Sequence, residues 1–391
     1  MLAPCTMQVG RLRGLLALLE WLGPWAPPRA LPRGIRRETW VLREGDVPGR
    51  RARSKGSRPR SGQPTRLEAR VFQPRGERSG TFLVAPGLHF DGPDDPRLER
   101  FCRILAHAGF RVVAPILPTY AELVVHGSAV DDLELVAKEL GRHLEPGERF
   151  TLFSISFGSW PALAVAARLP EHVDAVVTFG GYADFDAAVR FCVDGVMRRP
   201  EGDVQLASDP LNPPALFLNL LPWLEVPERD HAPLAEAWRE MTYRTWGRME
   251  LKAPGRLAPF AEALLERVPE TQRDLFLLGC GVRPGGPGLV EAALARAAEA
   301  IHFASPRPAL GELACPLVVC HGRDDDVIPW NEAEKLHAAV AGRVPSRLLL
   351  TGLYGHTAAG RPTPAALARE AGTLLEIARV LAAGGRVREL F

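Results

Sequence analysis

Short apolar segments that alternate with helical patterns constrain the fold of this chain more than any other feature. One of them, "TFLVAPG" (81–87), is wholly apolar, as expected of a strand buried on both faces of a parallel sheet. Three further strand patterns follow: "FRVVAPIL" (110–117), "RFTLFSI" (149–155) and "VDAVVTFGG" (173–181). Helical patterns separate them, at about 95–109, 128–143 and 158–169. This alternation predicts an α/β fold with a doubly wound, mostly parallel sheet.

The alternation stops at Tyr182 and resumes near Ala314, and the intervening segment has helical patterns rich in leucine and aromatic residues. The clearest of these patterns cover 233–249, 257–268 and 288–303. Strand and helix patterns then return, at 316–322, 331–341, 346–352 and 364–383. We therefore expect an α/β core formed by 38–181 and 315–391, interrupted by a large helical insertion at 182–314.

The N-terminal segment, 1–37, precedes this core. "RLRGLLALLEWLGPW" (11–25) is apolar but carries Glu20 and is too short to span a bilayer. We expect a helix packed on the domain; a signal peptide and an amphipathic helix on a membrane surface are the alternatives. The segments 38–42 and 66–74 predict an antiparallel strand pair, joined by the basic segment 49–63, which is either a solvated loop or an anion-binding patch.

Composition excludes some classes of function. The chain has 391 residues, 46% of them apolar and 24% charged, which is typical of a folded soluble protein. Its net charge of +2 argues against a dedicated nucleic-acid binder. Six cysteines are scattered without metal-ligand spacing, which favours a reducing, cytoplasmic location and no bound metal. Only four of the 48 basic residues are lysines, so clusters of arginine carry little functional information here.

A candidate nucleophile follows the third of the apolar strands. "SISFG" (154–158) has the small-x-Ser-x-Gly pattern of a nucleophile elbow, in which a sharp strand-to-helix turn exposes the central serine. Small flanking residues are needed because the strand and helix backbones pass close together at the turn. The alternative is an ordinary turn. A serine hydroxyl also needs a base that accepts its proton and a carboxylate that orients the base.

Both partners have candidates after later strands. In "HGRDDDVIP" (321–329) the spacing Gly-x-x-Asp-x-x-x-Pro selects Asp325, and Asp324 and Asp326 then hold the turn or face water. All three aspartates could equally be turn formers. In "LYGHT" (353–357), His356 is the candidate base, with a solvated loop histidine as the alternative. The order Ser156, Asp325, His356 is the Ser…Asp…His order of one class of triad.

The loop after the first buried strand has the features of an oxyanion-binding loop. In "APGLHFDG" (85–92) a glycine allows close approach of the backbone to a substrate. We expect the N–H groups of Leu88 and Phe157 to stabilise the oxyanion. His89 in the same loop either lines the substrate pocket or hydrogen-bonds the loop itself.

With these motifs the chain resembles the α/β-hydrolase superfamily, over about 66–180 and 316–383. The resemblance implies that "SISFG", "HGRDDDVIP", "LYGHT" and "PGLH" are the nucleophile elbow, acid, base and oxyanion loop. It also implies that the insertion is a helical cap, since members of this superfamily commonly carry one after the strand that follows the nucleophile helix. The chain departs from the common pattern at Ser154, where glycine is usual, and in a Pro-Gly where many members have His-Gly.

The expected function is a serine hydrolase that cleaves a carboxylic ester or thioester with an apolar acyl group, through an acyl-enzyme on Ser156. This chemistry needs no cofactor and no metal. Two alternatives are a non-catalytic ligand-binding protein on the same scaffold, and an acyltransferase that passes the acyl group to an acceptor other than water. The expected partner is a small-molecule ester, with weak membrane-surface contact through the N-terminal helix as a further possibility.

Overall fold

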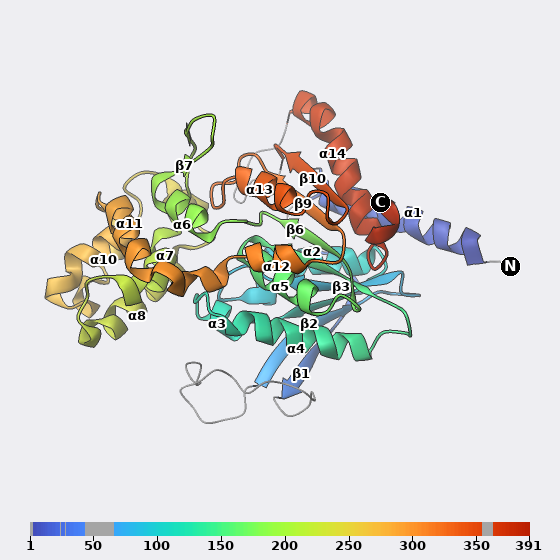
Figure 1. The fold of residues 1–391 in the computed structure, drawn as a ribbon, viewed down its shortest axis with the longest axis horizontal. Helices are drawn as coiled ribbons and strands as arrows, with labels where there is room; N and C mark the ends of the chain where they lie inside the picture. Colours follow the sequence, from blue (N-terminus) through green and yellow to red (C-terminus); the bar gives the residue numbers. More distant parts are fainter. Residues whose placement is uncertain (1–2, 24, 28, 44–65, 354–362) are drawn as a thin grey trace.

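The computed structural model describes residues 3–391 apart from 24, 28, 44–65 and 354–362. An eight-stranded sheet forms its centre, in the order β1-β2-β4-β3-β5-β6-β9-β10 (Figure 1). The strands are β1 (Arg36–Arg43), β2 (Arg66–Gln73), β3 (Gly80–Ala85), β4 (Phe110–Pro115), β5 (Phe150–Ile155), β6 (Val173–Phe179), β9 (Leu317–Gly322) and β10 (Ser346–Thr351). β2 runs antiparallel to both β1 and β4, and the other pairs are parallel.

This strand order is the topology of the α/β-hydrolase fold, so the predicted fold class is confirmed. Observed strands begin and end within two residues of the sequence-based expectations. The basic segment 49–63 lies outside the described residues.

Helices cover both faces of the sheet because successive strand residues point to opposite sides. Along β3, Leu83 and Ala85 belong to one hydrophobic cluster, whereas Phe82 and Val84 belong to the other. The first cluster includes residues of α4 (Ser128–Arg142) and α5 (Ser159–Arg168). The second includes residues of α1 (Ala3–Leu22), α2 (Pro96–His107) and α14 (Pro364–Ala382). A strand that packs against helices on both faces needs apolar side chains at successive positions. The apolar sequence of β3 meets this requirement.

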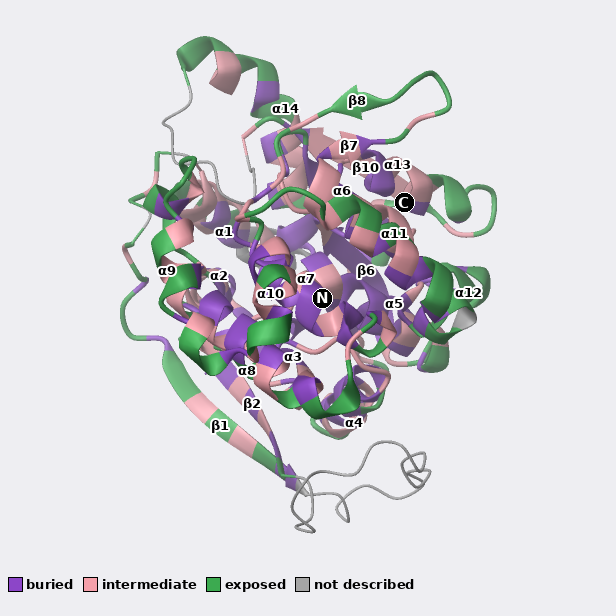
Figure 2. Cartoon of the chain, turned by 90° about the vertical axis from the view of Figure 1, so that its left-hand side faces the viewer, coloured by how far each residue is buried: buried purple, intermediate pink, exposed green. Residues whose placement is uncertain are grey.

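Helices dominate the segment between β6 and β9. They are α6 (Phe185–Asp194), α7 (Pro213–Leu220), α8 (Glu228–Thr245), α9 (Ala258–Glu262), α10 (Arg273–Gly279), α11 (Gly286–Ala297) and α12 (Arg307–Glu312). A two-residue strand pair, β7 (Val196–Met197) and β8 (Val204–Gln205), lies between α6 and α7. Most of these helices gather at one end of the molecule, where α7, α8 and α10 lie in front of the sheet (Figures 1 and 2). The division of the chain into a core and a separate inserted unit stays a prediction.

Two of the expected insertion helices are shorter than the sequence pattern indicated. After α9 the backbone hydrogen bonds tighten to i−3, with Leu264 N–H donating to Ala261 O, so 257–268 is not one continuous α-helix. α11 ends at Ala297 because Ala298 adopts a positive φ of 42°. Hydrophobic periodicity continues through both breaks, which is why it did not reveal them.

The N-terminal helix α1 packs against α14 and α2, and Leu18 is fully buried there. Among the described residues, no helix has both the length and the apolar character needed to cross a bilayer.

Candidate active site

Ser156 lies on the sharp turn between β5 and α5. Its φ is +51°, and only two other non-glycine residues of the described ranges, Leu123 and Ala298, have a positive φ. A non-glycine residue in this region carries backbone strain of about 1–3 kcal/mol, so the surrounding structure must impose it. The turn at 156–158 leads directly into α5, which places the serine at the N-terminal end of that helix. This is the backbone geometry that a nucleophile elbow requires.

Close contact between the elbow and the loop after β3 explains the glycines in both segments. A Cβ atom on Gly158 would lie 2.4 Å from Pro86 O and 2.6 Å from Ala85 O, closer than any side chain tolerates. A Cβ atom on Gly87 would lie 3.5 Å from the Cβ of Ser156. The proposed oxyanion loop and the proposed nucleophile are therefore in direct contact.

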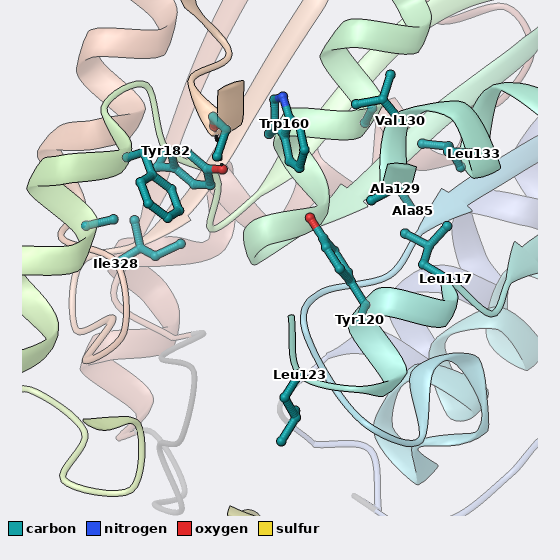
Figure 3. Packing of buried hydrophobic residues seen from close by; sticks show 14 of the residues in the cluster. Ala85, Leu117, Tyr120, Leu123, Ala129, Val130, Leu133, Trp160, Tyr182 and Ile328 are labelled. Atoms are coloured by element: carbon teal, nitrogen blue, oxygen red, sulfur yellow. Dashed lines mark hydrogen bonds between the residues drawn. The ribbon is translucent and has the colours of Figure 1, made fainter. Parts of the chain in front are cut away.

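Aromatic side chains hold the elbow from the other side. The hydroxyl of Tyr120 donates a hydrogen bond to Phe157 O, at 3.0 Å, and burial raises the pKa of this hydroxyl. Tyr120 reaches from beyond the end of β4 toward the β5–α5 turn, with Tyr182 on the opposite side of the close-up (Figure 3). The rings of Phe157 and Tyr182 lie 5.3 Å apart, and Phe185 of α6 packs edge-on against Phe157. The insertion thus contributes directly to the surroundings of the serine.

Asp325 is the buried member of the three aspartates that follow β9. Its Oδ1 accepts hydrogen bonds from the backbone N–H groups of Val327 and Ile328, both at 2.9 Å. Asp324 is exposed. Ile155, Phe179 and Cys320 are aligned across β5, β6 and β9, so Ser156 and Asp325 both follow the same edge of the sheet with one strand between them. This arrangement favours Asp325 as the acid, as its spacing predicts.

A hydrogen bond from His321 stabilises the turn that carries Asp325. It is fully buried on β9, and its Nε2 lies 2.9 Å from the carbonyl oxygen of Ile328, which accepts the hydrogen bond. The same Nε2 lies 3.4 Å from Oδ2 of Asp325. The imidazole therefore joins the beginning of the turn to its end. Sequence reasoning assigned His321 only to the end of the strand and did not detect this contact.

A largely buried ion-pair network connects the insertion to the same turn. Lys252 Nζ lies 2.8 Å from Asp209 and 2.6 Å from Asp326, and Asp209 N–H donates to Asp326 O at 2.7 Å. Burial raises the pKa of Asp209, although Lys252 acts in the opposite direction. Sequence reasoning missed this network. The available signal was Lys252 itself, one of only four lysines in an arginine-rich chain.

His89 hydrogen-bonds the loop that contains it. Its Nδ1 accepts from the backbone N–H of Asp91 at 3.1 Å, and its ring stacks on Phe90 and on Trp246, which directly follows α8. Burial lowers the pKa of His89, with Arg97 acting in the same direction and Asp95 in the opposite one. A role for His89 in lining the substrate pocket stays a prediction.

His89, Asp91 and Asp95 offer ligand atoms within 4.8 Å of one another. However, the Asp95 carboxylate already accepts hydrogen bonds from the backbone and guanidinium of Arg97, and it caps α2. A guanidinium in contact with this carboxylate opposes a cation at the same place. We therefore interpret the group as a helix cap with its counter-ion rather than as a metal site.

Of the remaining predicted site residues, the structure describes Leu88 and Phe157 but not His356. Leu88 and Phe157 are partly buried and pack against the core near the elbow. His356 lies outside the described residues, five positions after Thr351, where β10 ends beside Gly322 of β9. The structure thus positions the proposed nucleophile, acid and oxyanion loop, and the base stays a prediction.

No family model matches the chain, and no curated protein matches it in sequence. Among solved structures, an esterase domain from Rhodothermus marinus is similar, with 15% identity and a TM-score of 0.42 over 89% of this chain and 97% of that one. A dienelactone hydrolase from Anabaena variabilis has 14% identity and a TM-score of 0.41, over 89% and 95%.

An acylaminoacyl peptidase from Pyrococcus horikoshii has 13% identity and a TM-score of 0.42 over 80% of this chain, which spans only 39% of the peptidase. Because these likenesses are slight, the fold assignment rests on the strand order and not on them.

Gly158→Ala tests the contact between the elbow and the β3 loop. The added methyl group would push against Pro86 O, so we expect a loss of about 1–3 kcal/mol in the free energy of unfolding. Urea denaturation measures this. Gly76→Ala is the matched control, because a Cβ atom there meets nothing within 4 Å. Equal stability of the two variants would contradict the packing that we describe.

Lys252→Met tests the buried network. It leaves the carboxylates of Asp209 and Asp326 without their cation, and breaking such a pair costs about 3–5 kcal/mol. We expect the loss at neutral pH to shrink as the pH falls, since the orphaned carboxylates then become protonated. Lys138→Met, which removes an ion pair with Glu134 on the surface of α4, is the control and should cost about 0.5 kcal/mol. Denaturation at several pH values distinguishes the two.

His89 should make stability depend on pH. Because its folded pKa lies below its unfolded value of about 6.5, the unfolded chain binds more protons in this range. The stabilising contribution is complete above that pH and is lost as the pH falls toward the folded pKa. We expect His89→Gln to reduce the fall in melting temperature between neutral and mildly acidic pH. An unchanged dependence would show that His89 is not the group responsible.

Proposed function

We propose that this protein is a serine hydrolase that cleaves a carboxylic ester or thioester through an acyl-enzyme on Ser156. The observation that carries the proposal is the positive φ of Ser156 at the junction of β5 and α5, in contact with the loop after β3. Strained backbone persists only where the surrounding structure imposes it, and such sites are concentrated at functional positions. An ordinary strand-to-helix turn does not require a left-handed serine.

In the proposed mechanism, His356 accepts the proton of the Ser156 hydroxyl as the oxygen attacks the substrate carbonyl. Asp325 orients the imidazole of His356 and stabilises its charged form. The N–H groups of Leu88 and Phe157 stabilise the oxyanion; in known enzymes the loss of one such donor costs about 3–4 kcal/mol. His356 then protonates the leaving alcohol or thiol. Water, activated by the same imidazole, releases the acid and restores the serine.

The surroundings of the serine support an apolar acyl group. Phe157, Tyr182 and Phe185 form a contiguous aromatic cluster beside the elbow, partly supplied by the insertion. Aromatic rings provide a large apolar contact area with fixed geometry. We infer that they contact the acyl chain and that the insertion limits its length.

Ser156→Ala tests the catalytic role directly. We expect this variant to lose labelling by a fluorophosphonate probe, and to lose hydrolysis of short aryl esters by at least about 10⁴-fold. Ser154→Ala is the matched control. It lies two residues earlier on β5, fully buried, and its hydroxyl has no hydrogen-bond partner in the described part of the chain. Removing it should leave labelling, activity and stability intact.

Labelling of the Ser156→Ala variant at wild-type level would overturn the proposal. Absence of labelling in the intact protein, together with thermal stabilisation by an apolar ligand, would favour a binding protein on the same scaffold. Transfer of the acyl group to an added alcohol in preference to water would instead identify an acyltransferase, with Ser156 in the same role.

A further inference from the structure

An exposed apolar stripe runs along the N-terminal helix α1. Leu12 and Leu16 are 57% and 58% exposed, and Trp25, just beyond the helix, is 59% exposed. These are the most exposed of the large hydrophobic residues in the described part of the chain. An apolar patch of this kind at the surface of a folded protein commonly marks an interaction site.

The three side chains are aligned along the helix. Leu12 and Leu16 are four residues apart and share one face. Gly23 lies roughly two helical turns after Leu16 and roughly three after Leu12, so it falls on the same face. Its N–H donates to Leu19 O, which continues the helix. The indole of Trp25 covers this glycine, since a Cβ atom on Gly23 would lie 2.1 Å from Trp25 Cε2. Trp25 therefore extends the stripe beyond the end of α1.

The opposite side of α1 is already occupied. Leu18 is fully buried against α2 and α14, and a Cβ atom on Gly14 would lie 3.0 Å from the carbonyl oxygen of Ala108. Arg100 of α2 fastens the segment after α1 through hydrogen bonds to the carbonyl oxygens of Trp21 and Ala30. The stripe is thus held outward by a fixed helix whose other face completes the core.

Unpaired positive charge accompanies the stripe. Arg13, Arg29 and Arg33 are exposed, and within the described ranges none of them forms an ion pair. Glu20 is an exposed acidic residue on the same helix, and Arg11 is paired with Glu389. Arg13 is next to Leu12 in the chain, and Arg29 and Arg33 are in the segment that follows Trp25, so these exposed arginines outnumber the one exposed acidic residue of this N-terminal segment.

We propose that the stripe of Leu12, Leu16 and Trp25, with the three exposed arginines that flank it in the chain, docks on a membrane surface that contains anionic lipids. Leucine and tryptophan enter the boundary between headgroups and acyl chains, and arginine is attracted to anionic headgroups. Docking of a second copy is disfavoured, because a symmetric dimer would bring the same positive face against itself. The charge thus selects an anionic surface over self-association.

The position of α1 adds a geometric consequence. α1 projects from the end of the molecule opposite to the insertion helices α8, α10 and α11 (Figure 1). Because the stripe runs along α1, a membrane that binds it lies parallel to the helix axis, and the insertion helices lie at the far end of the molecule from the stripe. The proposal does not depend on the catalytic function.

Flotation of the full chain with lipid vesicles tests the proposal. We expect binding to vesicles of phosphatidylcholine with phosphatidylglycerol, and little binding to phosphatidylcholine alone. The variant Leu12→Ser/Leu16→Ser/Trp25→Ser should lose binding. The variant Arg13→Gln/Arg29→Gln/Arg33→Gln should bind roughly a hundredfold more weakly, at about fivefold for each arginine. High salt should weaken wild-type binding in the same way.

Val204→Ser/Met249→Ser is the matched control, since both residues are exposed apolar side chains in the insertion, each at 39%. This variant should bind vesicles like the wild type, and melting temperatures confirm that all variants are folded. Equal loss of binding in the control, or equal binding to neutral vesicles, would overturn the proposal. So would a wild-type dimer that fails to float and becomes monomeric in the Leu12→Ser/Leu16→Ser/Trp25→Ser variant, because the stripe would then be a dimer interface.

Discussion

The left-handed backbone of Ser156 depends on the close packing of two segments, the loop after β3 and the start of α5. Gly158 allows the carbonyl oxygens of Ala85 and Pro86 to approach, and Gly87 allows the loop to contact the serine. The strained turn and the contact between the loop and the serine thus have one physical origin, which is the close approach of the segments that follow two adjacent parallel strands.

The turn after β9 that carries Asp325, the candidate acid, is held by buried and partly buried polar contacts. His321 joins its two ends, and backbone N–H groups bind Asp325. Lys252 and Asp209 bind Asp326 from the insertion. Buried ionic groups of this kind contribute little net stability, but they allow only one arrangement of their partners, because each unpaired charge is costly. We infer that the insertion takes part in positioning the acid as well as in surrounding the substrate.

The two ends of the molecule have different properties. At one end, the insertion helices and an aromatic cluster surround the elbow. At the other, α1 completes the core with one face and presents leucine, tryptophan and arginine with the other. α1 packs on one face of the sheet, whereas the elbow follows the end of β5 at its edge.

The central sheet was predictable from the sequence, because strands covered on both faces are mostly apolar and alternate with helical patterns. Ser156 and Asp325 were found as candidates because a small-x-Ser-x-Gly turn and a Gly-x-x-Asp spacing are local patterns. The contacts of Lys252, His321 and Trp25 were not, and neither were the breaks after α9 and α11. Each of these depends on groups far apart in the chain, or on a backbone angle that hydrophobic periodicity does not record. Local burial and turn chemistry therefore determined the elements and their order, whereas only tertiary packing decided which charged and aromatic side chains meet.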